Sequence, residues 1–371
     1  MSVFAVTVQT LSPLHIGDGN SLRQDFDFVS HEGRTWRLNE DAILRDHEAL
    51  LRPDPSGHYP TPGELVLRDK ANFRNAAYFR YVLPGVARSG KTYAELRAFI
   101  KDANDCPYIP GSSLKGALRT ALAWTGWQEV GIRMKSRADV GNSKSWAAQP
   151  LERKIFGRDP NHDLLRALHV SDLFGKQKSG GTLMVVNAQV LTPKKAQSPI
   201  ELEALPGDIT FTGSITIDDA LFASFAEGEL HFANRRHWLN ELALRAQKHS
   251  QTRIEQLTGW FERAEEGYHS IAAFYRQLGA AKLTANQALI QLGWGTGWDG
   301  KTFGSHLQTD AALFEQLVSD FRLHKASKDS PRRKIGDAFP RSKRAAMRVK
   351  EGVAVATAPF GWVLLEMEKV G

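Results

Sequence analysis

Apolar residues recur along this chain with two periods, one typical of strands and one typical of helices. Residues 3–11 alternate apolar and polar side chains, which is the pattern of a strand with one buried face. Similar alternation, or a short apolar run, predicts strands at residues 25–30, 35–38, 167–172, 183–192, 209–217 and 352–367. Helical spacing predicts helices at residues 39–51, 92–100, 238–278, 285–292 and 311–321.

The order of these elements indicates the fold class. Helices fall between strands without a regular strand–helix–strand repeat, so we predict an α+β protein. A length of 371 residues with 42% hydrophobic residues favours two domains, each with its own core. We place the boundary near residue 225, which gives an N-terminal domain at 1–225 and a C-terminal domain at 226–371.

The segment 107–122, PYIPGSSLKGALRTAL, predicts a helix start that suits an anion. Pro110 and Gly111 make a turn, Ser112 or Ser113 is expected to cap the helix, and apolar residues then follow at the spacing of one buried face. Lys115 and Arg119 lie one turn apart in the same segment, and no acidic residue occurs between Pro107 and Gln128. We therefore expect a phosphate at this helix start.

The positive charge of the chain is local. The formal net charge is +7, yet residues 325–350 alone hold ten Lys or Arg against two Asp. Residues 131–158 hold seven more basic residues against two acids. Beside the helix start at 107–122, these clusters favour nucleic acid over a membrane as the partner.

Two further features limit the class of protein. No apolar run approaches the ~20 residues of a membrane span, so we expect a folded cytoplasmic protein with no membrane partner. Cys106 is the single cysteine, which excludes an intrachain disulfide and a multi-thiolate metal site. We predict neither a metal nor a cofactor.

Two glycine-rich segments match the consensus patterns of nucleotide-binding motifs. Residues 85–92 fit the P-loop pattern, although Pro84 interrupts the expected entry from a strand. Residues 295–300 fit a dinucleotide fingerprint, although the predicted flanking elements do not suit one. The second segment, continued by Lys301 and Thr302, allows close approach of another molecule, with Trp294 and Trp298 either stacking on bases or packing in a tight turn.

His15 follows the first predicted strand. An imidazole there could act as a general acid or base in RNA cleavage. The alternatives are hydrogen-bonded packing and a phosphate contact, because no second acid–base partner can be identified by spacing. We therefore predict no catalytic residue.

Four strings in the sequence together resemble the RAMP superfamily of CRISPR proteins. They are LSPLHIGDG at 11–19, the segment 107–122, Val-Ser-Asp at 170–172 and LGWGTGWDGKT at 292–302. Their order and the chain length are most similar to the subunit of type III-A (Csm) complexes that caps the 3′ end of the guide RNA.

This resemblance implies two ferredoxin-like, RRM-related modules with helical and loop insertions, at 1–225 and 226–371. It implies guide RNA (crRNA) as ligand, with target single-stranded RNA nearby and other RAMP backbone subunits as partners, in guide maturation and antiviral defence. It implies no catalytic residue here; a metal-independent endoribonuclease using His15 and a P-loop NTPase at 85–92 remain the alternatives. The predicted RNA-binding residues are His15, Gly111, Ser112, Ser113, Lys115, Arg119, Gly295, Gly297, Lys301 and Thr302.

Overall fold

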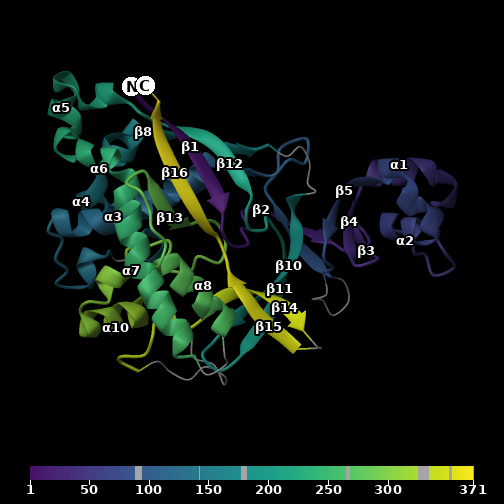
Figure 1. Cartoon of the computed structure of the whole chain (residues 1–371). Coiled ribbons are helices and arrows are strands. Elements are labelled where there is room, and N and C mark those ends of the chain that lie inside the picture. Colours follow the sequence, from purple (N-terminus) through teal and green to yellow (C-terminus); the bar gives the residue numbers. More distant parts are fainter. Residues whose placement is uncertain are drawn as a thin grey trace.

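A computed structural model describes residues 1–87, 94–141, 143–176, 182–264, 268–324, 334–350 and 353–370. Its largest sheet has seven strands: β1 (Ser2–Thr10), β7 (Tyr108–Ile109), β8 (Leu168–Val170), β9 (Leu173–Gly175), β12 (Thr210–Ile217), β13 (Gln287–Gln291) and β16 (Trp362–Val370). The strand order is β13–β16–β1–β12–β9–β7, with β8 also paired to β12. The first and last strands are neighbours, so both ends of the chain lie side by side (Figure 1).

A second sheet of six strands lies below the first in Figure 1. Its strands are β2 (Gly17–Arg23), β6 (Glu95–Phe99), β10 (Met184–Leu191), β11 (Ala196–Ala204), β14 (Lys343–Lys350) and β15 (Val353–Pro359). Their order is β15–β14–β10–β11–β6–β2. At Gly361, with φ +80°, the chain leaves β15 and enters β16, so a glycine turn connects the two sheets.

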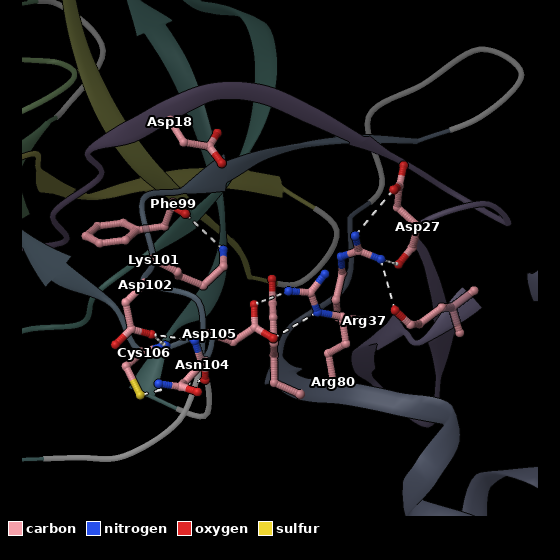
Figure 2. Close-up of polar contacts among 12 residues, drawn as sticks. Asp18, Asp27, Arg37, Arg80, Phe99, Lys101, Asp102, Asn104, Asp105 and Cys106 are labelled. Carbon is pink, nitrogen blue, oxygen red and sulfur yellow. Dashed lines mark hydrogen bonds and ion pairs between the residues drawn. The ribbon is translucent and has the colours of Figure 1, made fainter. Parts of the chain in front are cut away.

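A third, three-stranded sheet belongs to a small module that projects from the rest of the molecule (Figure 1). The module contains β3 (Phe28–His31), β4 (Arg34–Leu38), β5 (Phe79–Pro84), α1 (Glu40–Asp46) and α2 (Pro62–Leu67). It has its own apolar core, which includes Val29, Leu38 and Leu65. Arg80 of β5 donates two hydrogen bonds to Asp105, at 2.8 and 2.7 Å, and so connects the module to the loop before β7 (Figure 2).

The remaining helices gather mainly beside the seven-stranded sheet (Figure 1). They are α3 (Gly111–Glu129), α4 (Gln149–Phe156), α5 (Ser224–Leu230), α6 (Arg236–Asn240), α7 (Leu242–Glu262), α8 (His269–Gly279), α9 (Gly304–Leu307) and α10 (Ala311–Asp320). The main core contains fully buried residues of α3 and of the large sheet, such as Leu118, Val8 and Leu365. The α3 helix is therefore fixed along its apolar stripe.

A buried carboxylate, Glu203 of β11, connects several segments. Its side chain accepts hydrogen bonds from the Tyr81 hydroxyl at 2.8 Å and the Phe99 amide at 2.9 Å. Lys101 Nζ lies 2.6 Å from the same carboxylate. Lys101 Nζ also donates to the Phe99 carbonyl (Figure 2). The Glu203 carbonyl accepts a hydrogen bond from His15 Nδ1 at 2.6 Å. Burial, followed by the Glu203 charge, raises the pKa of Tyr81, so that its hydroxyl stays a donor.

Most of the predicted elements are confirmed. Strand alternation correctly located β1, β10 and β12, and the predicted hairpin at 25–38 is β3 and β4. The helix at 311–321 is α10, and the long helical pattern at 238–278 is divided into α6, α7 and α8. The α+β class is likewise confirmed.

Two predicted helices are wrong. Residues 95–99 form β6, in which Leu96 is buried and Glu95 and Arg97 are exposed, because β2 and β11 pair with this segment on its two sides. Residues 287–291 form β13 at the edge of the large sheet, where α7 packs beside it. A short apolar run fits a helix or a buried strand equally well, so sheet pairing decided both cases.

The C-terminal third also differs from the expectation. The single strand predicted at 352–367 is two strands, β15 and β16, in different sheets. Part of the basic tract at 325–350 is the strand β14, while residues 325–333 lie outside the described residues. Both large sheets contain strands from each side of residue 225, and the division into 1–225 and 226–371 stays a prediction.

The α3–α7 contact contains a buried histidine that makes stability depend on pH. His249 is 6% exposed and packs 5.6 Å from the Trp124 ring, and burial, with the nearby charges of Arg253 and His306, lowers its pKa to about 3. Unfolded His249 binds a proton near pH 6.5, whereas folded His249 does not. We therefore expect the free energy of unfolding to fall by about 1.4 kcal/mol per pH unit from this group below pH 6.5.

Urea unfolding at pH 7.0, 6.0 and 5.0 measures this slope. His249→Leu should make the free energy of unfolding depend less steeply on pH. Some dependence should remain, because burial also lowers the pKa of His15 and of His306. An unchanged slope in His249→Leu would contradict this assignment.

Candidate nucleic-acid interface

The α3 helix begins at Gly111 because only glycine fits there. A side-chain carbon at this position would collide with the carbonyl oxygens of Val170 and Ser171. The Gly111 amide donates to Asp172 Oδ1 at 2.7 Å, and the Ser113 amide donates to the Pro110 carbonyl at 2.9 Å. The predicted cap by Ser112 or Ser113 is therefore wrong, since Asp172 performs that role.

The two cations on α3 already have partners within the protein. Lys115 Nζ donates to the Leu168 carbonyl at 2.8 Å, and burial lowers the pKa of Lys115. Arg119 lies 2.9 Å from Glu152 and 2.7 Å from Asp163. The inference that this helix start lacks a negative partner is wrong. Glu152, Asp163 and Asp172, which are distant in sequence, are its acidic partners.

The glycine loop, residues 293–302, packs against the segment that carries His15. A side-chain carbon on Gly293 would collide with the His15 carbonyl, which accepts a hydrogen bond from the Trp294 amide at 2.8 Å. Gly295 has φ +88° and lies against Phe360. Of the two roles weighed for the tryptophans, the structure supports packing: Trp294 contacts Phe360 edge-on at 5.3 Å, and Trp298 packs against other aromatic rings.

His15 is a structural residue in this arrangement. Its side chain is 2% exposed, and its ring lies edge-on to Phe99 and Trp294. Because Nδ1 donates to the Glu203 carbonyl, the neutral ring leaves Nε2 without a proton. Burial lowers the pKa of His15. A buried neutral imidazole has no access to an RNA phosphate, so burial removes His15 from the candidate interface.

The α3 helix and the glycine loop enclose a common cavity of about 450 Å³. Its lining includes Ser112, Ser113 and Arg119 from the helix, and Lys301 and Thr302 from the loop. The structure thus brings together two predicted motifs that are about 180 residues apart in the sequence.

A second cavity of about 540 Å³ extends the first along α3. It adds Lys115, Arg153 and Arg166 to the lining, and both cavities share Ser112, Gly116 and Arg119. We call the two cavities together the α3 groove. Its charged lining consists of Lys115, Arg119, Glu152, Arg153, Asp159, Asp163, Arg166 and Lys301, an excess of positive charge.

The other predicted residues lie outside the groove lining. Gly295 and Gly297 line a separate cavity on another side of the loop, and Gly111 is buried at the helix start. Arg153 belongs to the basic cluster at 131–158, whereas Gly116 and Arg166 were not predicted from the sequence. Gly116 could have been noticed as a glycine within a predicted helix, and in the structure it is exposed with open space beside the backbone.

The structure bears differently on the two segments that match nucleotide-binding patterns. Gly85 follows β5, but residues 88–92 of the P-loop pattern lie outside the described residues. The glycine loop does follow a strand, β13, where a helix was expected, yet the next helix, α9, has four residues. So short a helix does not provide the phosphate-binding start of a dinucleotide fold.

The family model of the RAMP superfamily matches residues 7–298. This chain belongs to the RAMP superfamily. The membership confirms the resemblance and the expected RAMP architecture, which is built of ferredoxin-like modules.

Two curated relatives are both named CRISPR system Cms protein Csm5. The one from Streptococcus thermophilus is 26% identical over 188 residues, and the one from Methanocaldococcus jannaschii is 24% identical over 235 residues. The alignments cover 46% and 58% of this chain, and 51% and 53% of the relatives. The chain thus spans about half the length of the curated relatives it matches.

Two solved structures share the fold. A chain in the Csm–crRNA–target RNA ternary complex of a type III-A system has a TM-score of 0.69 at 23% identity, covering 99% of this chain and 100% of that one. Csm5 from T. onnurineus has a TM-score of 0.60 at 23% identity, covering 96% and 99%.

Within the described ranges, no three His, Cys, Asp or Glu side chains are grouped so that they could hold a metal ion. Nor do these ranges contain a helix whose length and apolar character would suffice to cross a membrane.

Two glycines of the loop allow a matched test of its packing. Gly295 and Gly297 both have positive φ, so alanine strains the backbone at either position. At Gly295 the added carbon would also lie 2.8 Å from Phe360 Cβ, whereas at Gly297 the space is open. We expect Gly295→Ala to lower the free energy of unfolding by roughly 1–3 kcal/mol more than Gly297→Ala. Urea unfolding of the two variants measures the difference, and equal losses would exclude the Phe360 contact as a constraint.

Proposed function

We propose that this chain is a guide-RNA-binding subunit of a type III-A Csm complex and that it caps the 3′ end of the guide. The observation that carries the proposal is the α3 groove, where the motif at 107–122 meets the glycine loop. The shared fold with a chain of a Csm–crRNA–target RNA complex supports this role. In this proposal the protein acts in the cytoplasm, beside target RNA and other RAMP subunits, in guide maturation and antiviral defence.

The groove suits a sugar-phosphate backbone for two reasons. Arg153 and Lys301 are exposed at its edges and form no ion pair within the described part of the chain, so their charges are available to phosphates. Between them the α3 surface carries small residues, Ser112, Ser113 and Gly116, which allow a ligand to approach the helix closely. The Ser112 and Ser113 hydroxyls can donate to phosphate oxygens.

Arg119 has a different role in this proposal. Its guanidinium is held by Glu152 and Asp163 and lies 4.0 Å from the Phe156 ring centroid. It therefore positions α4 and the loop after it along the groove, and it contributes little free charge. Replacing Arg119 would leave two carboxylates facing the groove, so loss of RNA binding in that variant would not identify a phosphate contact.

We propose a non-catalytic subunit. The imidazole of His15, the one candidate general acid or base weighed from the sequence, is buried and hydrogen-bonded to Glu203. Binding and assembly then account for the groove without a reaction at His15.

The double variant Arg153→Ala/Lys301→Ala tests the groove directly. We expect weaker binding to single-stranded guide RNA, because two phosphate contacts are lost. The slope of log K against log salt should become less steep by ~0.7 for each contact. Fluorescence anisotropy with labelled guide RNA at several salt concentrations measures both quantities.

Lys282→Ala is a matched control, since Lys282 is exposed after α8 and lines neither cavity of the groove. It should leave the salt slope unchanged. The proposal fails if the double variant binds guide RNA with the affinity and salt slope of the unaltered protein.

A further inference from the structure

A third cavity, of about 230 Å³, lies on another side of the glycine loop from the α3 groove. We call it the Arg253 cavity. It lies among the loop, α7 and the start of β14, and its lining includes Arg253, Gly297, Asp299, Lys343 and Arg344. Lys343 and Arg344 belong to the basic tract at 325–350, and the proposed role of the α3 groove involves none of the charged residues of this cavity.

The Arg253 cavity contains more positive charge than its own acid neutralises. Arg253, Lys343 and Arg344 line it, and Asp299 is the carboxylate among its lining residues. Asp299 Oδ2 lies 3.4 Å from Lys343 Nζ, so this acid is already engaged by one cation. The Asp299 charge also acts on Arg253, so one acid is shared by two cations and the described lining keeps an excess of positive charge.

Arg253 is the most deeply buried of the three cations. Its side chain is 6% exposed, and its Nη2 donates to Gln291 Oε1 at 2.7 Å and to the Thr296 carbonyl at 3.3 Å. Its Nε is buried without a hydrogen-bond partner among the described residues. An unpaired buried N–H of a charged group is costly, so the hydrogen bonds of Arg253 within the protein compensate its charge only in part.

The other groups of the cavity also suit an anion. Burial lowers the pKa of both Lys343 and Arg344, which means that their charges are held away from water. The Arg344 guanidinium lies 4.4 Å from the centroid of the Trp294 ring, which is outside the cavity lining, so Arg253 and Lys343 are the cations that an anion in the cavity would meet. The Tyr275 hydroxyl accepts a hydrogen bond from Trp362 Nε1, and its pKa, raised to about 12 by burial, keeps its own proton available as a donor.

We infer that the Arg253 cavity binds one phosphate group, either as inorganic phosphate or as a phosphate of an RNA chain. The volume is below the range of roughly 300–1,000 Å³ that accommodates larger organic ligands, which favours a phosphate group over a whole nucleotide. The RNA alternative rests on the proposed function, whereas inorganic phosphate binding does not.

Calorimetric titration of the full chain with inorganic phosphate tests the site. Lys343→Met should weaken binding at least tenfold, because it removes a cation and keeps the length of the side chain. Asp299→Asn should strengthen binding several-fold, because it removes the one carboxylate of the lining. If these residues had a purely structural role, the two variants would not change phosphate affinity in opposite directions. Lys282→Met, at an exposed position that lines neither the Arg253 cavity nor the α3 groove, should leave phosphate affinity within twofold.

Thermal unfolding with and without phosphate gives a second measurement for any variant that folds poorly, since a ligand of the folded state raises its midpoint. The inference is overturned if the unaltered protein shows neither heat of binding nor a shift in midpoint, or if Asp299→Asn does not bind phosphate more tightly.

Competition with oligoribonucleotides distinguishes the two sources of phosphate. Displacement of inorganic phosphate by RNA, lost in Lys343→Met, would assign the site to the RNA chain. Phosphate binding that RNA does not compete for would assign it to the free anion, and the inference would stand in either case. Failure of the Arg153→Ala/Lys301→Ala experiment with phosphate binding intact would count against the proposed function alone.

Discussion

The buried carboxylate of Glu203 is the interaction on which the arrangement of this protein depends. It joins β11 to β5 and β6 through Tyr81 and Phe99, and its partner Lys101 neutralises a charge that would otherwise be isolated in the core. The backbone carbonyl of Glu203 accepts a hydrogen bond from the His15 ring and so orients it. The backbone carbonyl of His15 in turn accepts a hydrogen bond from the Trp294 amide at the start of the glycine loop. A buried ion pair is weak evidence of net stability, but removal of one partner is strongly destabilising. The small module, the second sheet and the glycine loop therefore share one polar junction.

Internal pairing also determines which charges of the α3 groove can act on a ligand. Asp172, Asp163 and Glu152 satisfy the helix start and Arg119, so the positive charge within the motif at 107–122 is largely engaged. Exposed cations at the edges, such as Arg153 and Lys301, are the ones left for electrostatic attraction. The motif thus builds a rigid, closely approachable surface, and residues outside it provide much of the available charge.

Sequence patterns predicted elements well where one period dominated, as in β1, α3 and α10, and poorly in short segments, as in β6, which alternates between buried and exposed residues, and β13, which is buried along most of its length. The two motifs of the groove were identified separately, but their meeting depends on long-range packing that periodicity does not encode. The same holds for the acids that complete α3, which come from residues 152, 163 and 172. Hydrogen-bonded packing was one of the roles considered for His15 from the sequence, but its partner, the Glu203 carbonyl, could not be identified because it is a backbone atom 188 residues away.

The pairing of β1 with β16 has a consequence for biosynthesis. β1 lies in the middle of the large sheet, and one of its two neighbours, β16, is translated much later. Until β16 leaves the ribosome, one hydrogen-bonding edge of β1 stays open, and such exposed edges are prone to non-native association. Completion of the central sheet therefore depends on a contact of very long sequence separation, which has a high entropic cost of loop closure.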